Sequence, residues 1–446
     1  VRCIINMNRT VVIARQCRTS FFHDTIKLNF RKTATCFLST DNRQNEKKNS
    51  LYRHLYSKIL SCGPISVADY MKEILLHPSA GYYMTNDVFG SKGDFTTSPE
   101  ISQLFGEMVA LWIISEYKKI TNTPFQIIEL GPGRGTMIKD ILRIFARLKY
   151  SKNISVHLVE VSPTLSDIQA KNLCTDIQDC SVVTDKTANT ISYYKKGITK
   201  DGTDVYWYYS VKDIPRQFSV FLAHEFFDAL PIHKFQKTES GWREILIDVT
   251  KDTDENKFRY VLSPSPTPAT HAYVSKNESR LHVEISPETM VVADYIAQFL
   301  WECGGFGLII DYGHIGDKSD TFRAYSKHKQ EDPLTNPGTM DLTADVDFSI
   351  IKRIVEKDER LITFGPTTQS RFLKTMGINV RLQRLMKNVS SNERAQLESG
   401  YRMIMEEMGT CFKVLALFPS ILKEHLQKWP VAGFSETCKG DNVEIK

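Results

Sequence analysis

Apolar residues recur at helical spacing between residues 51 and 83, which predicts a small helical unit near the start of the folded chain. A polar, glycine-containing stretch at residues 89–100 follows and predicts a loop. Ser98 and Pro99 stand in the order of an N-cap and a first helical residue. We therefore expect a helix that begins there and continues through Trp112.

From residue 125 onward, short apolar runs alternate with helical segments. The runs lie at residues 125–130, 156–161, 220–223 and 306–310. Because strands buried on both faces read as continuous apolar runs, this alternation predicts an α/β fold with a parallel, doubly wound sheet. Residues 232–262 contain three strand-like segments and no helical pattern, which predicts an antiparallel insertion or an extension of the sheet.

The chain beyond Asp311 shows no apolar period for about thirty residues, as far as Asp341. A connection of that length within a domain predicts a functional or disordered loop. Helical patterns then return, and the apolar run at 412–418 predicts a last strand. The expected organisation is a leader and linker (1–50), a helical cap with a covering loop (51–120), a main domain (121–430) with a β insertion at about 232–285 and a long loop at about 312–341, and a tail (431–446).

The composition is that of an ordinary folded protein, with 41% hydrophobic and 24% charged residues. Residues 1–50 carry 10 Lys/Arg and 3 Asp/Glu, which leaves 47 basic and 49 acidic side chains for the rest. The chain after residue 50 is therefore nearly neutral, which argues against nucleic acid as a partner. Residues 7–40 contain six basic residues and one acid, the composition of a mitochondrial presequence. A disordered basic tail is the alternative.

The cysteine spacing and the hydropathy argue against a zinc-binding protein and against a membrane-spanning protein. The nine cysteines form no CxxC pair and no Cys/His cluster at zinc spacing, so we expect reduced thiols in a matrix-like compartment and no metal site. No run of about 18 uncharged apolar residues occurs, so the sequence predicts no transmembrane segment.

Residues 125–136 read FQIIELGPGRGT, an apolar strand that runs directly into a glycine loop and a helix. Such a turn brings backbone close to a ligand and directs free helix N–H groups at it. The dinucleotide fingerprint needs its third glycine five positions after the first, whereas the glycines here are Gly131, Gly133 and Gly135. Glu129 would repel a pyrophosphate but suits the sulfonium and ammonium groups of S-adenosyl-L-methionine. We expect that cofactor, with a dinucleotide or a structural turn as alternatives.

Two further acids are candidates for holding the cofactor. Residues 156–161 read VHLVEV, which places Glu160 at the end of the next strand. A carboxylate there can accept hydrogen bonds from two ribose hydroxyls. Asp94 lies in the expected covering loop and is a candidate lid contact to the cofactor.

Polar residues follow two later strands, at the edge where open α/β sheets bind ligands. Residues 224–231 read HEFFDALP and include Glu225 and Asp228. Without further context, the simplest interpretation is that these two acids lie in the first turn of a helix, where the helix dipole favours negative charge. Their position beside the expected methyl donor favours a substrate-binding role instead. Residues 311–314 read DYGH, which makes His314 a candidate substrate-side group, with a structural histidine as the alternative.

Taken together, these motifs resemble the MidA family of mitochondrial protein arginine methyltransferases, which act as assembly factors for respiratory complex I. The resemblance covers about residues 51–420 and rests on five motifs that agree in order and spacing. They are GYY at 81–83, GDFTTSPE at 93–100, ELGPGRG at 129–135, HEFFDALP at 224–231 and DYGH at 311–314.

The resemblance implies a class I methyltransferase fold, S-adenosyl-L-methionine as cofactor and a location in the mitochondrial matrix. It further implies symmetric dimethylation of an arginine on a complex I core subunit of the 49 kDa type. An arginine guanidinium keeps its proton at matrix pH, so it becomes a nucleophile only when a carboxylate binds and orients it. Glu225 is the first candidate for this role and Asp228 the second.

Two function hypotheses of other classes remain open. A catalytically silent assembly chaperone for complex I would show the same fold and the same glycine loop. An NAD(P)-dependent oxidoreductase is disfavoured by the glycine spacing and by Glu129.

Overall fold

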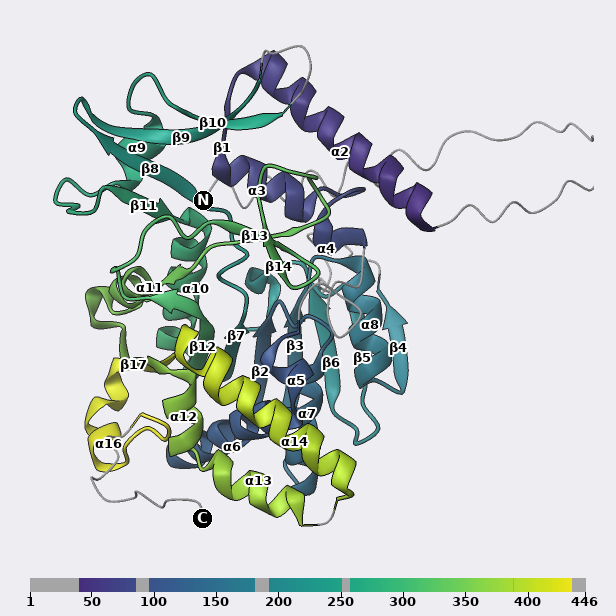
Figure 1. The fold of residues 1–446 in the computed structure, drawn as a ribbon. Coiled ribbons are helices and arrows are strands. Elements are labelled where there is room, and N and C mark those ends of the chain that lie inside the picture. The colour runs from purple at the N-terminus through teal and green to yellow at the C-terminus, as the bar shows by residue number, and fades with distance from the viewer. Residues whose placement is uncertain (1–39, 86–95, 181–191, 251–256, 388, 435–446) are drawn as a thin grey trace, which may run out of the picture. The chain divides into compact units, whose positions relative to one another are not determined.

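A mixed sheet forms the centre of the larger unit, residues 44–446 (Figure 1). The computed structural model describes residues 40–85, 96–180, 192–250, 257–387 and 389–434, and side chains from residue 50 onward. Residues 44–446 belong to one unit, and the contacts reported below lie within it. The order of the main strands across the sheet is β17-β18-β12-β7-β2-β3-β6-β5-β4, and β16 pairs with the end of β12.

The strands have the following bounds. They are β2 (Phe125–Leu130), β3 (Ile154–Val159), β4 (Asp176–Asp179), β5 (Lys195–Ile198), β6 (Asp204–Tyr208), β7 (Ser219–His224), β12 (Gly305–His314), β16 (Val346–Asp347), β17 (Leu361–Thr368) and β18 (Phe412–Pro419). The sequence pattern predicted β2, β3, β7, β12 and β18 and missed β4, β5, β6 and β17.

The direction of the strands agrees with the prediction in the middle of the sheet only. Strands β12, β7, β2, β3 and β6 run parallel. Both edges are antiparallel, because β5 pairs antiparallel with β6, and β18 pairs antiparallel with β12. Only one of these edges lacks the apolar-run signature of the core: β4 is exposed along its whole length, whereas β18 is almost wholly buried. The α/β class and the parallel pairing of the predicted strands β2, β3, β7 and β12 are therefore confirmed, and the antiparallel edges add to that core.

Helices cover both faces of this sheet, as a doubly wound fold requires. Successive residues of a strand point to opposite faces, so along β2 Ile127 packs in one core and Ile128 in the other. The first core is covered by α6 (Gln103–Ile120), α7 (Thr136–Arg147), α8 (Pro163–Leu173), α12 (Gln369–Thr375) and α13 (Ile378–Met386). The second core is covered by α10 (Pro287–Cys303) and α11 (Phe348–Val355).

The predicted N-terminal helical unit is present as α2 (Thr40–Cys62), α3 (Val67–Leu76) and α4 (Tyr82–Thr85). Helix α2 begins within the stretch expected to be a linker, because the helix extends N-terminally from its buried residues Leu51, Leu55 and Ile59 through a polar segment without an apolar period. Within the described part of the chain, no helix is both long and apolar enough to span a membrane.

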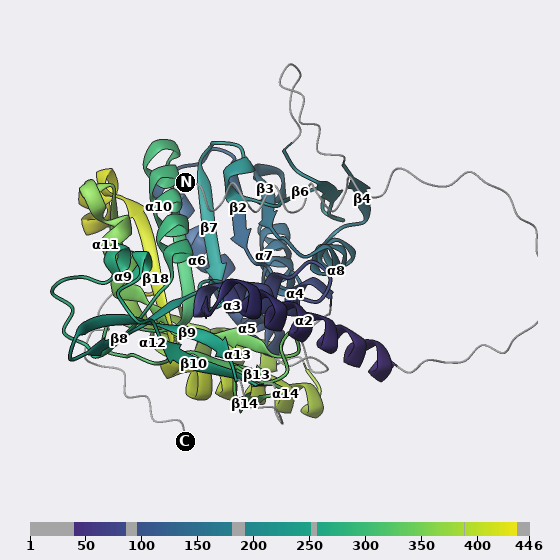
Figure 2. The same ribbon diagram turned by 90° about the horizontal axis from the view of Figure 1, so that it is seen from above.

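The helical unit packs against a second, antiparallel sheet, which Figure 2 shows from above. That sheet consists of β1 (Ile65–Ser66), β8 (His233–Thr238), β9 (Gly241–Val249), β10 (Phe258–Leu262) and β11 (His282–Ile285). Short helix α9 (Pro268–Tyr273) lies between β10 and β11 in the chain. The three predicted strands are confirmed, and they form a separate sheet rather than an extension of the central one.

The stretch from 312 to 341 was expected to be a loop, and that expectation is wrong in part. Strand β12 continues to His314, and a small sheet follows with β13 (Arg323–Ser326), β14 (Lys329–Glu331) and β15 (Asp341–Thr343). These strands are three or four residues long and β14 is wholly exposed, so they carry no apolar period. Phe322 and Leu342 nevertheless pack with the helical unit.

The helix start predicted at Ser98 differs in detail. Helix α5 spans Ser98–Ile101 and has Thr97 as its N-cap, without a side-chain cap, so Ser98 is not the N-cap. Its hydroxyl is buried and donates instead to Met408 Sδ at 3.5 Å. Ser102 then interrupts the expected single helix and caps α6 by accepting the Leu104 N–H.

The C-terminal helices close the first core. Helix α14 (Ser391–Arg402) leads through a π-helical turn (Met403–Glu407) and α15 (Met408–Cys411) into β18. Helix α16 (Lys423–Lys428) follows β18, and residues 431–434 return to α6, where Trp112 Nε1 donates to Ala432 O at 3.1 Å. The start of the expected tail thus packs against the main domain.

We expect Gly313→Ala to destabilise the protein by more than about 2 kcal/mol through overpacking where β12 meets β16. A Cβ at Gly313 would lie 2.5 Å from both Phe348 Cε2 and Val346 O. Gly307→Ala in the same strand is the matched control, because its Cβ would meet Phe221 Cβ at an ordinary 3.4 Å. Urea unfolding followed by circular dichroism measures both, and equal stabilities would contradict the packing argument.

Candidate functional site

The glycine loop connects the carboxyl end of β2 to the start of α7. Gly131, Gly133 and Gly135 have φ angles of +60°, +55° and +77°, a region that residues with a side chain rarely adopt. A Cβ at Gly131 would also lie 2.9 Å from the ring of Phe226. Gly135 is the N-cap of α7 and offers no side chain to the first helical N–H groups. The loop therefore leaves backbone donors available to a ligand.

A cleft of about 390 Å³, counted with its open mouth, lies along this loop. The side chains around it come from three parts of the chain: the stretch before and within α5, the glycine loop with α7, and the end of β7. The lining residues are Thr97, Pro99, Glu100, Glu129, Gly131, Pro132, Gly133, Arg134, Thr136, Met137, His224 and Glu225. The cleft thus brings together the predicted cofactor loop and one of the predicted substrate acids.

Glu129 projects from the end of β2 into this cleft. Its side chain is buried, and burial raises its pKa to about 8. Among the described residues, nothing donates a hydrogen bond to Oε2 of this carboxyl. A buried acid without a partner is unfavourable by itself and favours a cationic or hydrogen-bonding ligand.

Glu160 is held in place just after β3. Its Oε1 accepts the Ser162 N–H at 2.7 Å, and its Oε2 accepts from Gln169 Nε2 at 2.9 Å. Burial raises the pKa of Glu160 to about 7, although these hydrogen bonds oppose the shift. Glu160 does not itself line the cleft, but each carboxylate oxygen keeps a second lone pair that can accept a hydroxyl.

The sequence reasoning missed Gln169, which connects the loop to Glu160. Its Nε2 also donates to Gly133 O at 2.7 Å, and its Oε1 accepts from Trp207 Nε1 at 2.9 Å. All of these contacts are buried, so Gln169 fixes the loop and the acid in one geometry. The sequence pattern gave no sign that this glutamine differs from the other polar residues of its helix.

The edge beyond β7 and β12 gathers three buried carboxyls, from Glu225, Asp228 and Asp311. Burial raises all three pKa values, and their mutual repulsion adds to it for Glu225 and Asp311. Burial raises the pKa of Asp228 only to about 6, because the hydrogen bond that Thr343 Oγ1 donates to its Oδ2 at 2.8 Å and the charge of Arg323 oppose the shift. Glu225 and Asp311 titrate well above the ordinary range.

Asp311 organises the segment that carries the other two acids. Its Oδ2 accepts the backbone N–H groups of Phe226, Phe227 and Asp228 at 3.2, 2.9 and 3.3 Å. These bonds hold the turn in which Glu225 has a φ of +50°, an unusual value for a residue with a side chain. Asp311 was noted in the sequence only as part of a motif, because no pattern reveals which N–H groups a buried acid will bind.

His224 is the second residue that sequence reasoning left out of the site. It is buried at the end of β7 between Phe105 and Phe412, and burial lowers its pKa to about 3. Its Nε2 lies 3.3 Å from Glu225 Oε1, yet neither atom completes a hydrogen bond within the described residues. With Glu129 Oε2 and Asp228 Oδ1, four buried polar atoms at this edge lack a partner there.

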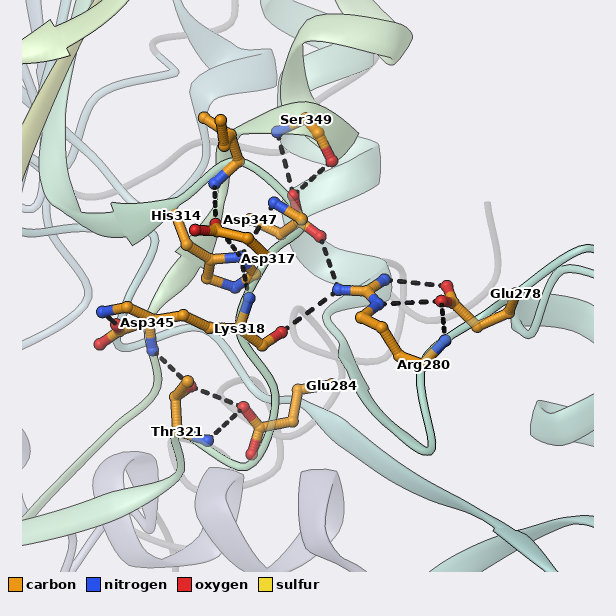
Figure 3. Close-up of polar contacts among 12 residues, drawn as sticks. Glu278, Arg280, Glu284, His314, Asp317, Lys318, Thr321, Asp345, Asp347 and Ser349 are labelled. Carbon is orange, nitrogen blue, oxygen red and sulfur yellow. Dashed lines mark hydrogen bonds and ion pairs between the residues drawn. The ribbon is translucent and has the colours of Figure 1, made fainter.

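His314 lies in a different environment, which Figure 3 shows. Its Nδ1 accepts the N–H groups of Gly316 and Lys318 at 3.0 and 3.4 Å. Nearby, Arg280 donates to Glu278 and Asp347, and this network joins the end of β12 to the segment before β11. His314 is not among the residues that line the cleft, so its substrate-side role stays a prediction.

Asp94 lies outside the described residues, but the segment that follows it reaches the cleft. Thr97, Pro99 and Glu100 are lining residues. Glu100 accepts a short hydrogen bond from Thr136 Oγ1 and lies 3.8 Å from Arg134 Nη1. The predicted covering loop therefore ends on the glycine loop and the first residue of α7.

The chain is similar to known proteins over most of its length. The model of a family of S-adenosyl-L-methionine-dependent methyltransferases matches residues 108–367. The human mitochondrial protein arginine methyltransferase NDUFAF7 is 48% identical over 376 residues, which cover 83% of each chain. The Xenopus tropicalis protein of the same name is 46% identical over 433 residues, 95% of this chain and 98% of that one. The Drosophila melanogaster homologue is 46% identical over 392 residues, 86% and 89% of the two chains.

Solved structures support the fold. A crystal structure of a Burkholderia thailandensis protein bound to S-adenosyl-homocysteine has a TM-score of 0.69 to this chain at 22% identity. It covers 87% of this chain and 96% of its own. The class I methyltransferase fold and the cofactor S-adenosyl-L-methionine, both expected from the sequence, are confirmed by the family match and this likeness.

We expect the affinity for S-adenosyl-L-methionine to rise by about tenfold or more between pH 6 and pH 8. The raised pKa values of Glu129 and Glu160, about 8 and about 7, mean that across this window Glu160 loses most of its proton and Glu129 about half. The ionised carboxylates then attract the charged cofactor groups and accept the ribose hydroxyls. Isothermal titration at several pH values measures the effect.

Glu129→Gln and Glu160→Gln provide the controls for this pH dependence. Each should lose part of the rise in affinity, and the double variant should bind weakly with little dependence on pH. A wild-type affinity that does not change over this range would contradict the assignment of the two acids to the cofactor.

Proposed function

The chain belongs to the family of S-adenosyl-L-methionine-dependent methyltransferases that includes the mitochondrial NDUFAF7 proteins, and from this premise we propose that it methylates a protein arginine. The proposed substrate is an arginine of the 49 kDa-type core subunit of respiratory complex I, the product is symmetric dimethylarginine, and the site of action is the mitochondrial matrix. The substrate subunit, the product and the role in complex I assembly rest on the resemblance to the MidA family.

The observation that supports an arginine substrate is a pair of buried acids beside the glycine loop, each with one carboxyl oxygen that lacks a hydrogen-bond partner among the described residues. Glu225 Oε1 and Asp228 Oδ1 are buried and have no hydrogen-bond donor among the described residues. Buried carboxyls that repel one another favour a cationic guest, which neutralises them and donates to their free oxygens. A guanidinium has five N–H donors in a planar fork and stays charged, so it matches this requirement better than a neutral substrate.

The residues near the glycine loop fit the cofactor. Gly131, Gly133 and Gly135 let the backbone approach it, Glu129 offers a free carboxyl oxygen to its cationic groups, and Glu160 accepts from its ribose. The bound cofactor supplies an electrophilic methyl group on a positively charged sulfur. Because Glu129 and Glu225 line the same cleft, the two binding sites share one space.

Glu225 is proposed to bind the guanidinium and to accept the proton that methylation releases. A guanidinium nitrogen that gains a methyl group loses one N–H proton, and the product remains a cation. The raised pKa of Glu225 makes its carboxylate a stronger base than an exposed glutamate, which suits proton acceptance near neutral pH. Orientation of the reacting nitrogen contributes more to the rate acceleration than proton transfer does. Correct placement can lower the activation barrier by roughly 7–11 kcal/mol.

Asp228 and Asp311 have different proposed roles. Asp228 keeps one oxygen free and is the second candidate for binding the guanidinium. Asp311 Oδ2 accepts hydrogen bonds from three backbone N–H groups, so we assign Asp311 to positioning Glu225 rather than to binding substrate. Thr343 holds the other oxygen of Asp228, which ties this acid to the small sheet.

Glu225→Gln should lower methyl transfer by at least about a hundredfold, because the change removes the charge and the base while it keeps the size. Cofactor affinity should change little, since Glu225 is assigned to the substrate. The measurement is transfer of a tritiated methyl group to a complex I 49 kDa-type subunit or its peptide at saturating cofactor. Mass spectrometry of the product separates symmetric from asymmetric dimethylarginine.

One control variant and two contrary outcomes complete this experiment. Asp248→Asn changes an acid on β9 that pairs with Arg259 away from the cleft, and it should leave transfer unchanged. A wild-type rate in Glu225→Gln would remove its substrate role and make Asp228 the candidate. If the wild-type protein binds the cofactor and transfers no methyl group to any complex I subunit, the assembly-chaperone hypothesis replaces the enzyme.

Asp311→Asn should lower kcat by about tenfold to a hundredfold with a smaller change in cofactor affinity. The amide accepts more weakly than a carboxylate, and it lets the turn that holds Glu225 relax. Because the role is one of positioning, the pH profile of kcat should also shift, since a relaxed turn changes the burial of Glu225 and its distance from Asp228, which together raise its pKa. An unchanged kcat and pH profile in a folded Asp311→Asn protein would rule this role out.

A further inference from the structure

Two histidines and a glutamate from the helical cap meet at a site separate from the cleft. His54 lies on α2, Glu73 lies on α3, and His77 is the residue that ends α3. One ligand atom of each of these three side chains lies within 4.8 Å of the other two. Glu73 and His77 are four residues apart, so a single turn of helix brings them to the same face.

The separation and type of these atoms fit a transition-metal ion. His54 Nε2 lies 3.6 Å from Glu73 Oε2, close to the distance between neighbouring ligands in a tetrahedral zinc site. The rings of His54 and His77 pack edge to face with centroids 5.1 Å apart. Two histidines and one carboxylate form a recognised set of zinc ligands, with water in the fourth position.

The neighbours of these three residues leave the required atoms available. Lys58 Nζ donates to Glu73 Oε1 at 2.9 Å, which orients the carboxylate and leaves Oε2 directed toward His54. The Ser79 N–H donates to His77 Nδ1 at 3.4 Å and Ser79 Oγ lies at the same distance from it, so Nε2 is the candidate ligand atom of this ring.

We propose that His54, Glu73 and His77 bind Zn²⁺ and that the ion fastens α2 to the end of α3. The segment just after His77 includes Tyr83, which contacts both sides of the candidate active site. Tyr83 O accepts from Ser162 Oγ at 2.6 Å, beside Glu160, and its hydroxyl donates to Asp341 Oδ1 at 2.7 Å. A metal ion bound here would therefore stabilise the helical cap just before the segment whose Tyr83 contacts the candidate active site.

The test uses the purified full chain, stripped of metal with a chelator and titrated with zinc chloride alone. We expect one ion per chain and a melting temperature that rises by about 2–4 °C at saturating Zn²⁺. His54→Gln and His77→Gln should each weaken the binding by at least about tenfold. His54 is 45% exposed, so its replacement leaves the fold intact. His271→Gln, at an exposed histidine of α9, is the matched control and should bind like the wild type.

Cobalt(II) substitution identifies the ligands directly. Absorption bands of a tetrahedral nitrogen and oxygen site, lost in His54→Gln and His77→Gln, would support the proposal. A thiolate-to-cobalt charge-transfer band would assign the ion to a cysteine instead and overturn it. So would zinc affinity that is unchanged in both histidine variants, or a wild-type chain that binds no zinc. None of these outcomes depends on the methyl-transfer assay, so this inference and the proposed function can fail separately.

Discussion

The buried carboxylate of Asp311 is the interaction on which the candidate active site depends. Its Oδ2 accepts three consecutive backbone N–H groups, from Phe226, Phe227 and Asp228, and its Oδ1 accepts that of Tyr312. These bonds fasten the segment after β7 to the end of β12. Glu225 is thereby held with a positive φ and its side chain lines the cleft. Without this anchor, the segment would lose the acceptor for three buried donors.

That anchor also sets the electrostatics of the site. Asp311 brings a third buried carboxyl next to Glu225 and Asp228, and burial raises the pKa of each. The arrangement is unfavourable for the protein alone, because like charges in a region shielded from water repel strongly. It becomes favourable when a cation enters. The same acids that reduce the stability of the empty site can therefore select a guanidinium and prepare a base for its proton.

The helical cap and the small sheet connect this site to the cofactor side. Tyr83 contacts Ser162 next to Glu160 and Asp341 at the start of β15, while Thr343 of the same strand donates to Asp228. The small sheet that replaces much of the loop expected at residues 312–341 thus supports a substrate acid directly, through Thr343 at the end of β15. The short strands β13 to β15 are stable because Phe322 and Leu342 pack against the helical cap, and not because of their own sequence pattern.

The sequence by itself determined the α/β class, the strands β2, β3, β7, β12 and β18, and the glycine loop with Glu129. These features depend on local pattern: continuous apolar runs for strands buried on both faces, and glycine where the backbone needs a positive φ. Motif order and spacing were also sufficient to identify the family, and its cofactor with it.

The tertiary structure alone decided which polar groups meet. Gln169 joins the glycine loop to Glu160, and Asp311 binds three N–H groups from a segment more than eighty residues earlier in the chain. Only the tertiary structure shows that His314 lies apart from the residues that line the cleft. Only the tertiary structure shows that His54 lies close to Glu73 and His77. No periodicity encodes such contacts, because hydrogen bonds and ligand sets depend on distances in space between residues that are remote in sequence.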